Sequence, residues 1–140
     1  MESIRCEDFK KRLVELTIKS GLSGFPVKRR DQLILLRAVS NGFQPDIIYE
    51  EKTVNEIIRT QVKCLKCLTG LDHVTVRRQL VDERFLSREN DGSRYRLGPG
   101  PDSVQFETTV TDLNIEALLA SAEAELAARK KAFMERQTTL

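Results

Sequence analysis

A turn sequence between two strand-like runs constrains the fold of this chain more than any other feature. Asp91-Gly92 tolerates positive φ at both central positions of a tight turn, which makes it a strong hairpin signal. The run that follows, Arg94-Tyr95-Arg96-Leu97, alternates as a half-buried strand does. We therefore expect a β-hairpin, in which Tyr95 packs inward between two arginines.

Three stretches with helical spacing of apolar residues precede the hairpin. They predict helices over Asp31–Ser40, Glu50–Val62 and Asp72–Arg84. Asp72 is the expected N-cap of the third helix, because its side chain can accept a hydrogen bond from the first turn. Asn55 has poor helix propensity, so we expect its side chain to bind the backbone near Tyr49 or the hairpin.

Weaker patterns flank this central region. They predict a helix over Glu7–Ser20, a strand over Val104–Val110 and a long helix over Asp112–Gln137. Gly98-Pro99-Gly100-Pro101 ends the central region, because its two prolines interrupt either regular ladder. We expect three parts: an N-terminal helix and loop (1–24), a winged-helix-like domain (25–97), and a linker with the C-terminal helix (98–140).

Three helices followed by a hairpin is the order of elements in a winged helix-turn-helix. The predicted class is therefore α+β and mostly helical, with such a core between an N-terminal helix and a long C-terminal helix. In this fold one helix enters the major groove of DNA, and flanking cations hold the phosphates. The side chains predicted to face bases are Thr75, Arg77, Arg78 and Gln79, and those predicted to hold phosphate are Arg88, Arg94 and Arg96.

The distribution of charge favours the same interpretation. The net charge of the whole chain is only +2. Residues 28–97 carry 14 Lys and Arg against 10 Asp and Glu, whereas residues 98–140 carry 4 against 7. A basic middle and an acidic end are expected if the middle contacts phosphate. We therefore predict a DNA-binding transcriptional regulator or accessory factor, with double-stranded DNA as its partner.

The alternative function is a non-catalytic protein-interaction module of winged-helix fold without affinity for nucleic acid. Exposed arginines commonly lie on a solvated surface, and several carboxylates could pair with them here: Asp82, Glu83, Glu89 and Asp91. We do not expect an enzyme. The chain has one histidine, His73, no glycine-rich phosphate loop and no paired-carboxylate motif. No cofactor is predicted.

Five sequence blocks occur in order within residues 25–97. They are Phe25-Pro26-Val27-Lys28-Arg29-Arg30, Tyr49–Ile58, Arg77–Asp82, Phe85–Arg88 and Asp91–Tyr95. In these blocks the chain resembles the bacterial family known as domain of unknown function 2087, whose members occur alone or attached to ArsR-type transcriptional regulators. The resemblance implies a winged-helix-like fold, a prokaryotic source and nucleic-acid binding, with no established activity.

An insertion distinguishes the chain from that family. About eight residues, Lys63–Gly70, lengthen the turn between the second and third predicted helices and alter the expected docking geometry. They include Cys64 and Cys67, which with His73 have the spacing of a partial zinc site, and Cys6 could be a fourth ligand. The competing interpretation is that these cysteines are small apolar residues and that His73 simply begins a helix. We predict no metal.

The ends of the chain bear on its location and its partners. Residues 1–11 lack the apolar run of a secretory signal, and no stretch approaches the ~18 apolar residues needed to cross a bilayer, so we expect a cytoplasmic protein without a membrane partner. One face of the predicted C-terminal helix is apolar and must be covered. It can pack on the chain's own core or on a second copy, and we favour a homodimer. This face comprises Ile115, Leu118, Leu119, Ala122, Leu126 and Phe133.

Overall fold

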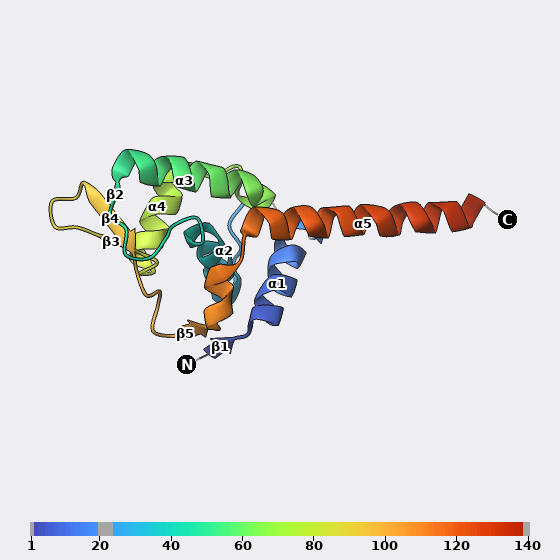
Figure 1. Cartoon of the computed structure of the whole chain (residues 1–140), viewed down its shortest axis with the longest axis horizontal. Helices are drawn as coiled ribbons and strands as arrows, with labels where there is room; N and C mark the ends of the chain where they lie inside the picture. Colours follow the sequence, from blue (N-terminus) through green and yellow to red (C-terminus); the bar gives the residue numbers. More distant parts are fainter. Residues whose placement is uncertain (1, 20–23, 139–140) are drawn as a thin grey trace.

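Helices form most of the computed structural model, which describes residues 2–19 and 24–138, and a three-stranded sheet lies at the edge of the body opposite the free end of the last helix (Figure 1). The α-helices are α1 (Cys6–Val14), α2 (Arg29–Ser40), α3 (Glu51–Cys64), α4 (His73–Asp82) and α5 (Ile115–Thr138). A π-helical turn, η1 (Glu15–Lys19), and two 3₁₀ turns, η2 (Lys66–Leu68) and η3 (Thr108–Asp112), accompany them. The strands are β1 (Glu2–Ile4), β2 (Tyr49–Glu50), β3 (Leu86–Arg88), β4 (Arg94–Leu97) and β5 (Val104–Phe106). The predicted α+β class is confirmed.

The second helix, α2, is the centre of the core. Every residue from 33 to 40 is buried, so the helix is covered on all sides rather than along one stripe. Phe9 and Leu13 of α1 and Val54 and Ile58 of α3 belong to the same core. The predicted helix over Glu7–Ser20 is confirmed as far as Lys19, and Ser20 lies outside the described residues.

The insertion does not form an extended turn. The helix α3 continues to Cys64, and η2 follows almost directly. Leu65, Cys67 and Leu68 are buried in the core, so the added residues extend the apolar interior. The link between α3 and α4 is therefore ordered and packed.

The hairpin is confirmed, and its strands join a third. The sheet is antiparallel in the order β2-β4-β3, with Tyr49 opposite Tyr95 and Arg88 also opposite Tyr95. Gly92 has φ +78°, the left-handed conformation that its place in the turn requires. Tyr95 is 1% exposed, as predicted from the alternation of its neighbours.

The N-terminal and C-terminal parts of the chain pair with each other through two short strands, a contact that was not predicted. The strand β1 runs parallel to β5, with Ile4 opposite Phe106. The predicted strand over Val104–Val110 ends at Phe106, and η3 follows it. The predicted C-terminal helix begins at Ile115 rather than Asp112, and Asn114 caps this start by accepting a hydrogen bond of 3.0 Å from the backbone N–H of Ala117 at its Oδ1.

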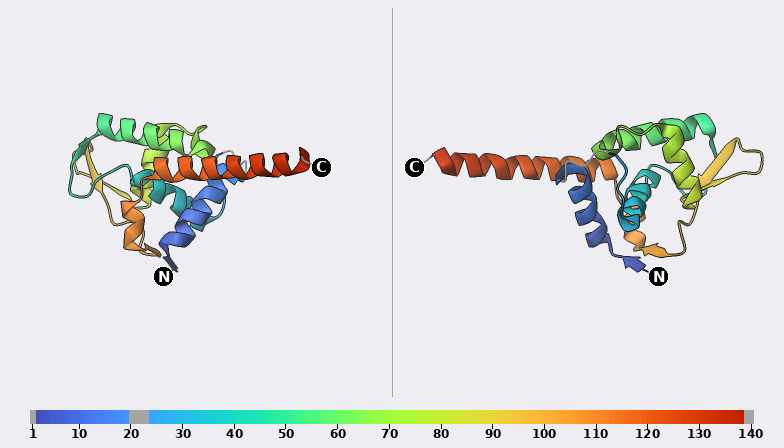
Figure 2. Two further views of the ribbon diagram at one scale, coloured as in Figure 1. Left: turned by 45° about the vertical axis from the view of Figure 1, so that its right-hand side comes forward. Right: turned by 180° about the vertical axis from the view of Figure 1, so that it is seen from behind.

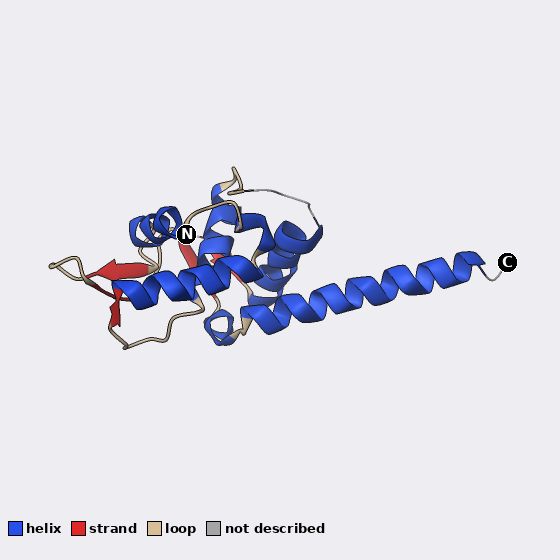
Figure 3. Ribbon diagram, turned by 90° about the horizontal axis from the view of Figure 1, so that it is seen from above, coloured by secondary structure: helices blue, strands red, loops and turns tan. Residues whose placement is uncertain are grey.

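The last helix, α5, lies on the body with its first half and projects beyond it with its second (Figures 1 and 2). Ile115 and Leu119 are buried, whereas every residue from 127 to 137 is exposed. The view from above shows the arm pointing away from the end of the molecule that carries the hairpin (Figure 3). The helix therefore covers the chain's own core with only part of its apolar face.

Candidate nucleic-acid interface

The outer face of α4 is oriented by a cap at its start and by buried side chains along its inner side. Asp72 Oδ1 accepts a hydrogen bond of 2.8 Å from the backbone N–H of Thr75, which confirms the predicted N-cap and lowers the pKa of the Asp72 carboxyl. Val76 and Leu80 are buried on the inner side. The predicted site residues left exposed on the outer face are Thr75, Arg78 and Gln79.

Arg77 lies at the boundary of that face and points toward α3. Its side chain is 16% exposed. Its Nη1 donates a hydrogen bond of 2.6 Å to Asn55 Oδ1, and its Nη2 lies 3.4 Å from Glu51 Oε1. The prediction that Asn55 binds the backbone is therefore wrong. The predicted contact between Arg77 and bases would have to compete with partners that already hold its guanidinium.

Tyr95 links Arg77 to the hairpin. The guanidinium carbon of Arg77 lies 6.0 Å from the centre of the Tyr95 ring, and that of Arg88 lies 5.9 Å from the same centre. The Tyr95 hydroxyl donates a hydrogen bond of 3.1 Å to Glu51 Oε1. Burial, and then this hydrogen bond to a carboxylate, raise the pKa of Tyr95. One ring therefore connects the start of α3, the middle of α4 and the hairpin.

The three hairpin arginines lie on two faces of the sheet. Arg88 is opposite Tyr95 in the register and shares its face, where its Nε donates a hydrogen bond of 3.1 Å to the backbone oxygen of Gly92. Arg94 and Arg96 flank Tyr95 in the strand, so they occupy the other face. The predicted site residues of the hairpin are thus divided between the side that faces α4 and the side that does not.

The carboxylates near the hairpin arginines lie mainly on the face that carries Arg94 and Arg96. Arg96 Nε lies 3.2 Å from Glu89 Oε1, and both side chains are about half exposed, which makes this a weak pair. Glu50 stands opposite Arg94 across the sheet. Within residues 2–19 and 24–138, no carboxylate lies within ion-pair distance of Arg78 or Arg94. These two guanidinium groups keep their positive charge available.

A hollow of about 260 Å³ lies between α4 and the hairpin. Arg78 borders it from the helix and Arg88 from the strand, with Asp82 as the one carboxylate among its lining residues. Arg77 lines it too, so three arginines from two elements border one space, which favours an anionic group there.

Cys64, Cys67 and His73 lie around the link between α3 and α4. Burial raises the pKa of both the Cys64 and the Cys67 thiols, which disfavours the thiolate that zinc requires. His73 begins α4, and its Nε2 lies 3.5 Å from Nη2 of Arg59. In the part of the chain that the structure describes, no three His, Cys, Asp or Glu side chains converge as a ligand set.

Two residues of the site were not predicted from the sequence in this role. Glu51 and Asn55 bind Arg77 from α3. They are four positions apart and so lie on one side of a helix, which is a signal that could have identified them as a pair of partners. Their role depends on the crossing of α3 and α4, which spacing within one helix does not define.

The arm of α5 leaves the candidate interface uncovered. The hairpin and the free end of α5 lie at opposite ends of the molecule in every view (Figures 1, 2 and 3).

Among the described helices, none combines the length and the apolarity that a bilayer span requires.

Comparison with known proteins identifies one family. The family described as uncharacterized proteins conserved in bacteria, domain of unknown function 2087, matches residues 21–97, which is more than half of the chain. The matched region contains α2, α3, α4 and the three-stranded sheet. No curated protein and no solved structure matches the chain.

Proposed function

The chain belongs to this bacterial family of unknown function, and we propose, from the order of its elements and the placement of its arginines, that it binds double-stranded DNA as a transcriptional regulator or accessory factor in the cytoplasm. The elements α2, β2, α3, α4, β3 and β4 would act as a winged helix-turn-helix. Their order, and the sheet order β2-β4-β3, support this assignment. The observation that carries the proposal is the hollow between α4 and the hairpin, which Arg78 and Arg88 border together.

Each predicted site residue has a role in this proposal. Thr75, Arg78 and Gln79 would face base edges in the major groove, since they are exposed on α4. The hairpin arginines would hold phosphates on either side of the hairpin: Arg88, Arg94 and Arg96. For Arg96 this requires release from Glu89, at small cost because both groups are half exposed.

Arg77 has a different role in the proposal. It is a positioning residue that sets the angle between α4 and the hairpin through its contacts with Asn55, Glu51 and Tyr95. An arginine that read bases would have to leave all three partners.

Titration of the full chain with generic duplex DNA at several salt concentrations tests the proposal. Affinity should fall steeply with salt, and Arg94→Ala should reduce the slope of log K against log salt by about 0.9 for each chain bound, as loss of one phosphate contact per chain does. Arg78→Ala should weaken binding to a selected site by roughly tenfold or more. Arg5→Ala, a loss of the same charge at an exposed position outside the hairpin, α4 and α5, is the matched control and should change neither. Absence of affinity at low salt would leave the protein-interaction module as the function.

We propose further that two copies pair through their α5 helices in antiparallel orientation. An isolated helix of about 12 residues is marginal in water, so the exposed half of α5 needs a cover. The apolar row that is buried at Ile115 and Leu119 continues on the same face of the helix, at intervals of seven residues, to Leu126 and to Phe133, which is 56% exposed. A second copy can cover this row.

Charge along α5 favours the antiparallel orientation. The first half, 115–126, carries three acidic residues and no basic one: Glu116, Glu123 and Glu125. The second half, 127–138, carries four basic residues and one acidic one: Arg129, Lys130, Lys131 and Arg136, with Glu135. Antiparallel pairing places opposite charges side by side, whereas parallel pairing places like charges together.

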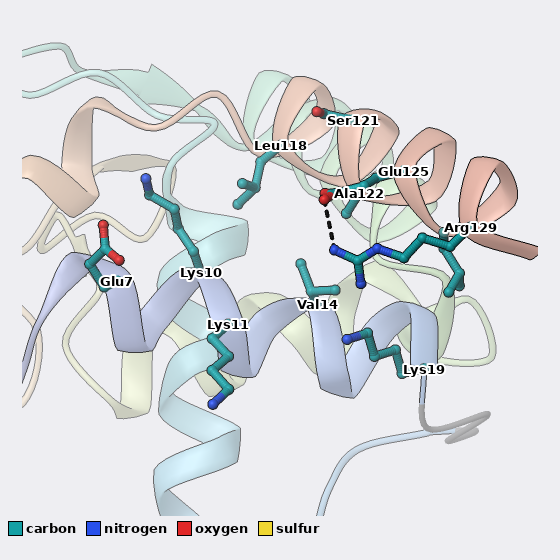
Figure 4. A pocket seen from close by; sticks show the side chains of 11 residues that line it. Glu7, Lys10, Lys11, Val14, Lys19, Leu118, Ser121, Ala122, Glu125 and Arg129 are labelled. Atoms are coloured by element: carbon teal, nitrogen blue, oxygen red, sulfur yellow. Dashed lines mark hydrogen bonds and ion pairs between the residues drawn. The ribbon is translucent and has the colours of Figure 1, made fainter. Parts of the chain in front are cut away.

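A groove of about 350 Å³ between α1 and α5 provides a seat for the second copy. Val14 of α1 and Leu118 of α5 point into the space between the helices, and Ala122 lines it further along (Figure 4). In the antiparallel arrangement Phe133 of the second copy lies opposite Ala122, so that a large side chain meets a small one.

Sedimentation equilibrium of the full chain without DNA tests the pairing. We expect twice the mass of one chain, and Phe133→Glu should raise the dissociation constant of the dimer by about a hundredfold or more, because two buried rings are lost. Ala128→Glu adds the same charge on the opposite side of the exposed arm and is the matched control. Ala122→Cys with Phe133→Cys in one chain should cross-link two copies on oxidation, and neither change alone should. A wild-type monomer, or cross-linking by Phe133→Cys alone, contradicts the antiparallel pair.

A further inference from the structure

Arg37 is a buried cation without a counter-charge. It is 6% exposed and lies near the end of the central helix α2. Its Nε and Nη2 donate hydrogen bonds of 3.0 and 2.9 Å to one neutral acceptor, Asn41 Oδ1, and its guanidinium carbon lies 5.9 Å from the centre of the Phe85 ring. No carboxylate in the described ranges pairs with it, and burial lowers its pKa to about 10.

Another arginine beside the core, Arg12, has the carboxylate partner that Arg37 lacks. Arg12 forms a double hydrogen bond with Asp31, whose side chain is 6% exposed, at 2.8 and 2.9 Å. Such planar pairing is how a guanidinium is normally compensated near a core. An arginine buried with a single amide acceptor is therefore unusual, since an unpaired buried charge is strongly unfavourable.

The guanidinium of Arg37 borders a cavity of about 410 Å³. The segment that leaves β4 borders the cavity at Gly100, and the uncharged polar residues among those that line it are Gln105, Thr108 and Thr111. Nε and Nη2 of Arg37 donate hydrogen bonds, whereas Nη1 donates none to any described residue. Within the described part, every fully buried side-chain N or O atom has a hydrogen-bond partner, so Nη1 is not fully buried. Nη1 is therefore accessible, and the cavity that Arg37 lines is the space it can reach.

The nearest acidic side chain at the cavity does not neutralise Arg37. Asp102 lines the rim, but its side chain is 92% exposed and its Oδ2 accepts a hydrogen bond of 3.0 Å from Arg84 Nη1. The rest of the lining is neutral. The cavity therefore combines one positive charge at its inner end with amide and hydroxyl groups around it, which is the composition of a site for a small anion.

We propose that this cavity binds a small oxyanion, a carboxylate or a phosphate group, with Arg37 as its charged ligand and Gln105 and Thr108 as neutral partners. The anion supplies the counter-charge that the protein itself does not provide. The site is separate from the α4–hairpin interface, and the proposal stands whether or not the chain binds DNA.

Calorimetric titration of the full chain with sodium phosphate and with sodium succinate tests this site, with sodium chloride at matched ionic strength as the reference. At least one of the two anions should bind saturably with one site per chain. Arg37→Met retains the stem of the side chain and should weaken that binding by at least tenfold, and Arg37→Lys, which keeps the charge without the fork, should weaken it by roughly tenfold. Phosphate as the better ligand would identify a phosphate compound as the natural class, and succinate a carboxylate.

The matched control is Arg30→Met, which removes another arginine of α2. The Arg30 side chain is partly exposed, and its Nε lies 2.7 Å from Glu2 Oε1. It should bind the anion within twofold of the wild type. Thermal unfolding gives a second measurement: the anion should raise the midpoint of the wild type and of Arg30→Met, and should leave that of Arg37→Met unchanged. Equal binding by Arg37→Met and wild type, or no saturable binding of either anion to the wild type, overturns the proposal.

Discussion

Replacement of Arg77 by methionine separates a positioning role from DNA contact. Methionine keeps the apolar stem and removes the guanidinium, which lies between Asn55, Glu51 and Tyr95. If Arg77 positions α4 against the hairpin, its removal should destabilise the folded chain even in the absence of DNA. If it contacts DNA instead, its removal should be visible mainly in binding.

The expected loss of stability follows from the three contacts. The hydrogen bond of 2.6 Å to Asn55 has a charged donor and is partly buried, which is worth about 1 kcal/mol. The contact of 3.4 Å with Glu51, whose side chain is 44% exposed, adds about 0.5 kcal/mol. The Tyr95 ring at 6.0 Å adds about 0.5 kcal/mol. We therefore expect Arg77→Met to lower the free energy of unfolding by about 2 kcal/mol and the midpoint of thermal unfolding by roughly 6–8 °C.

Urea unfolding and DNA titration measure the two roles separately. Combining Arg77→Met with Asn55→Ala should reveal a coupling free energy of about 1 kcal/mol, because both changes remove the same hydrogen bond. The slope of log K for DNA against log salt should stay at the wild-type value. Arg94→Met is the matched control, since Arg94 is exposed and forms no ion pair with a described carboxylate. Its stability should stay within about 0.5 kcal/mol of the wild type, and its salt slope should fall by about 0.9 for each chain bound.

The opposite pattern would refute the reasoning. If Arg77→Met unfolds like the wild type and loses about 0.9 of the salt slope, Arg77 contacts phosphate and its partners in the free protein are incidental. No coupling with Asn55→Ala would lead to the same conclusion.

Two further predictions concern the core. Asp31→Asn should lower stability at pH 7 by about 1–2 kcal/mol, because it removes the double hydrogen bond from Arg12. Arg12 holds the pKa of Asp31 below its ordinary value. This stabilisation is therefore complete above the carboxyl pKa of the unfolded chain and is lost as the pH falls through the lowered pKa. In urea unfolding the difference between variant and wild type should shrink as the pH falls through that range, and a difference that is the same at acidic and neutral pH contradicts the assignment. Gly98→Ala should destabilise by about 2 kcal/mol or more in the same assay, because its Cβ would collide with the backbone oxygen of Arg84, whereas Gly70→Ala, which meets no atom within 4 Å, is the control and should be nearly neutral.

The helices and the hairpin could be predicted because their signals are local. Apolar residues at helical spacing define α2, α3 and α4, and Asp91-Gly92 defines the turn between β3 and β4. The pairing of β1 with β5 could not be predicted in this way. Each strand has three residues, too few to show a period, and their contact joins positions about 100 residues apart in the sequence.

Which arginine side chains are buried and which are exposed could not be predicted from the sequence for a similar reason. Arg77 and Arg78 are adjacent on one helix, yet the first is held by α3 and the second is exposed, because the crossing of two helices decides which side is covered. Arg37 lies in the helix predicted over Asp31–Ser40, but no spacing rule indicates that a cation belongs to the buried part of that helix. Such positions depend on packing between elements, and they are where the candidate sites of this chain lie.

The salt dependence of wild-type binding connects the DNA interface with the paired α5 helices. Three hairpin arginines available to phosphate imply a slope of about −2.7 for one chain, so affinity should fall about 40-fold between 50 and 200 mM salt. A dimer that engages two half-sites should double the slope to about −5.4, a fall of about 1,800-fold over the same range. Phe133→Glu, which separates the copies without touching the interface, should bring the steeper slope back to the shallower one. A steep slope that Phe133→Glu leaves unchanged would mean that one chain makes more phosphate contacts than its hairpin provides. In that case the cations of α1 or of the α5 arm would have to belong to the interface, and the division of the molecule into a DNA-binding end and a pairing end would be wrong.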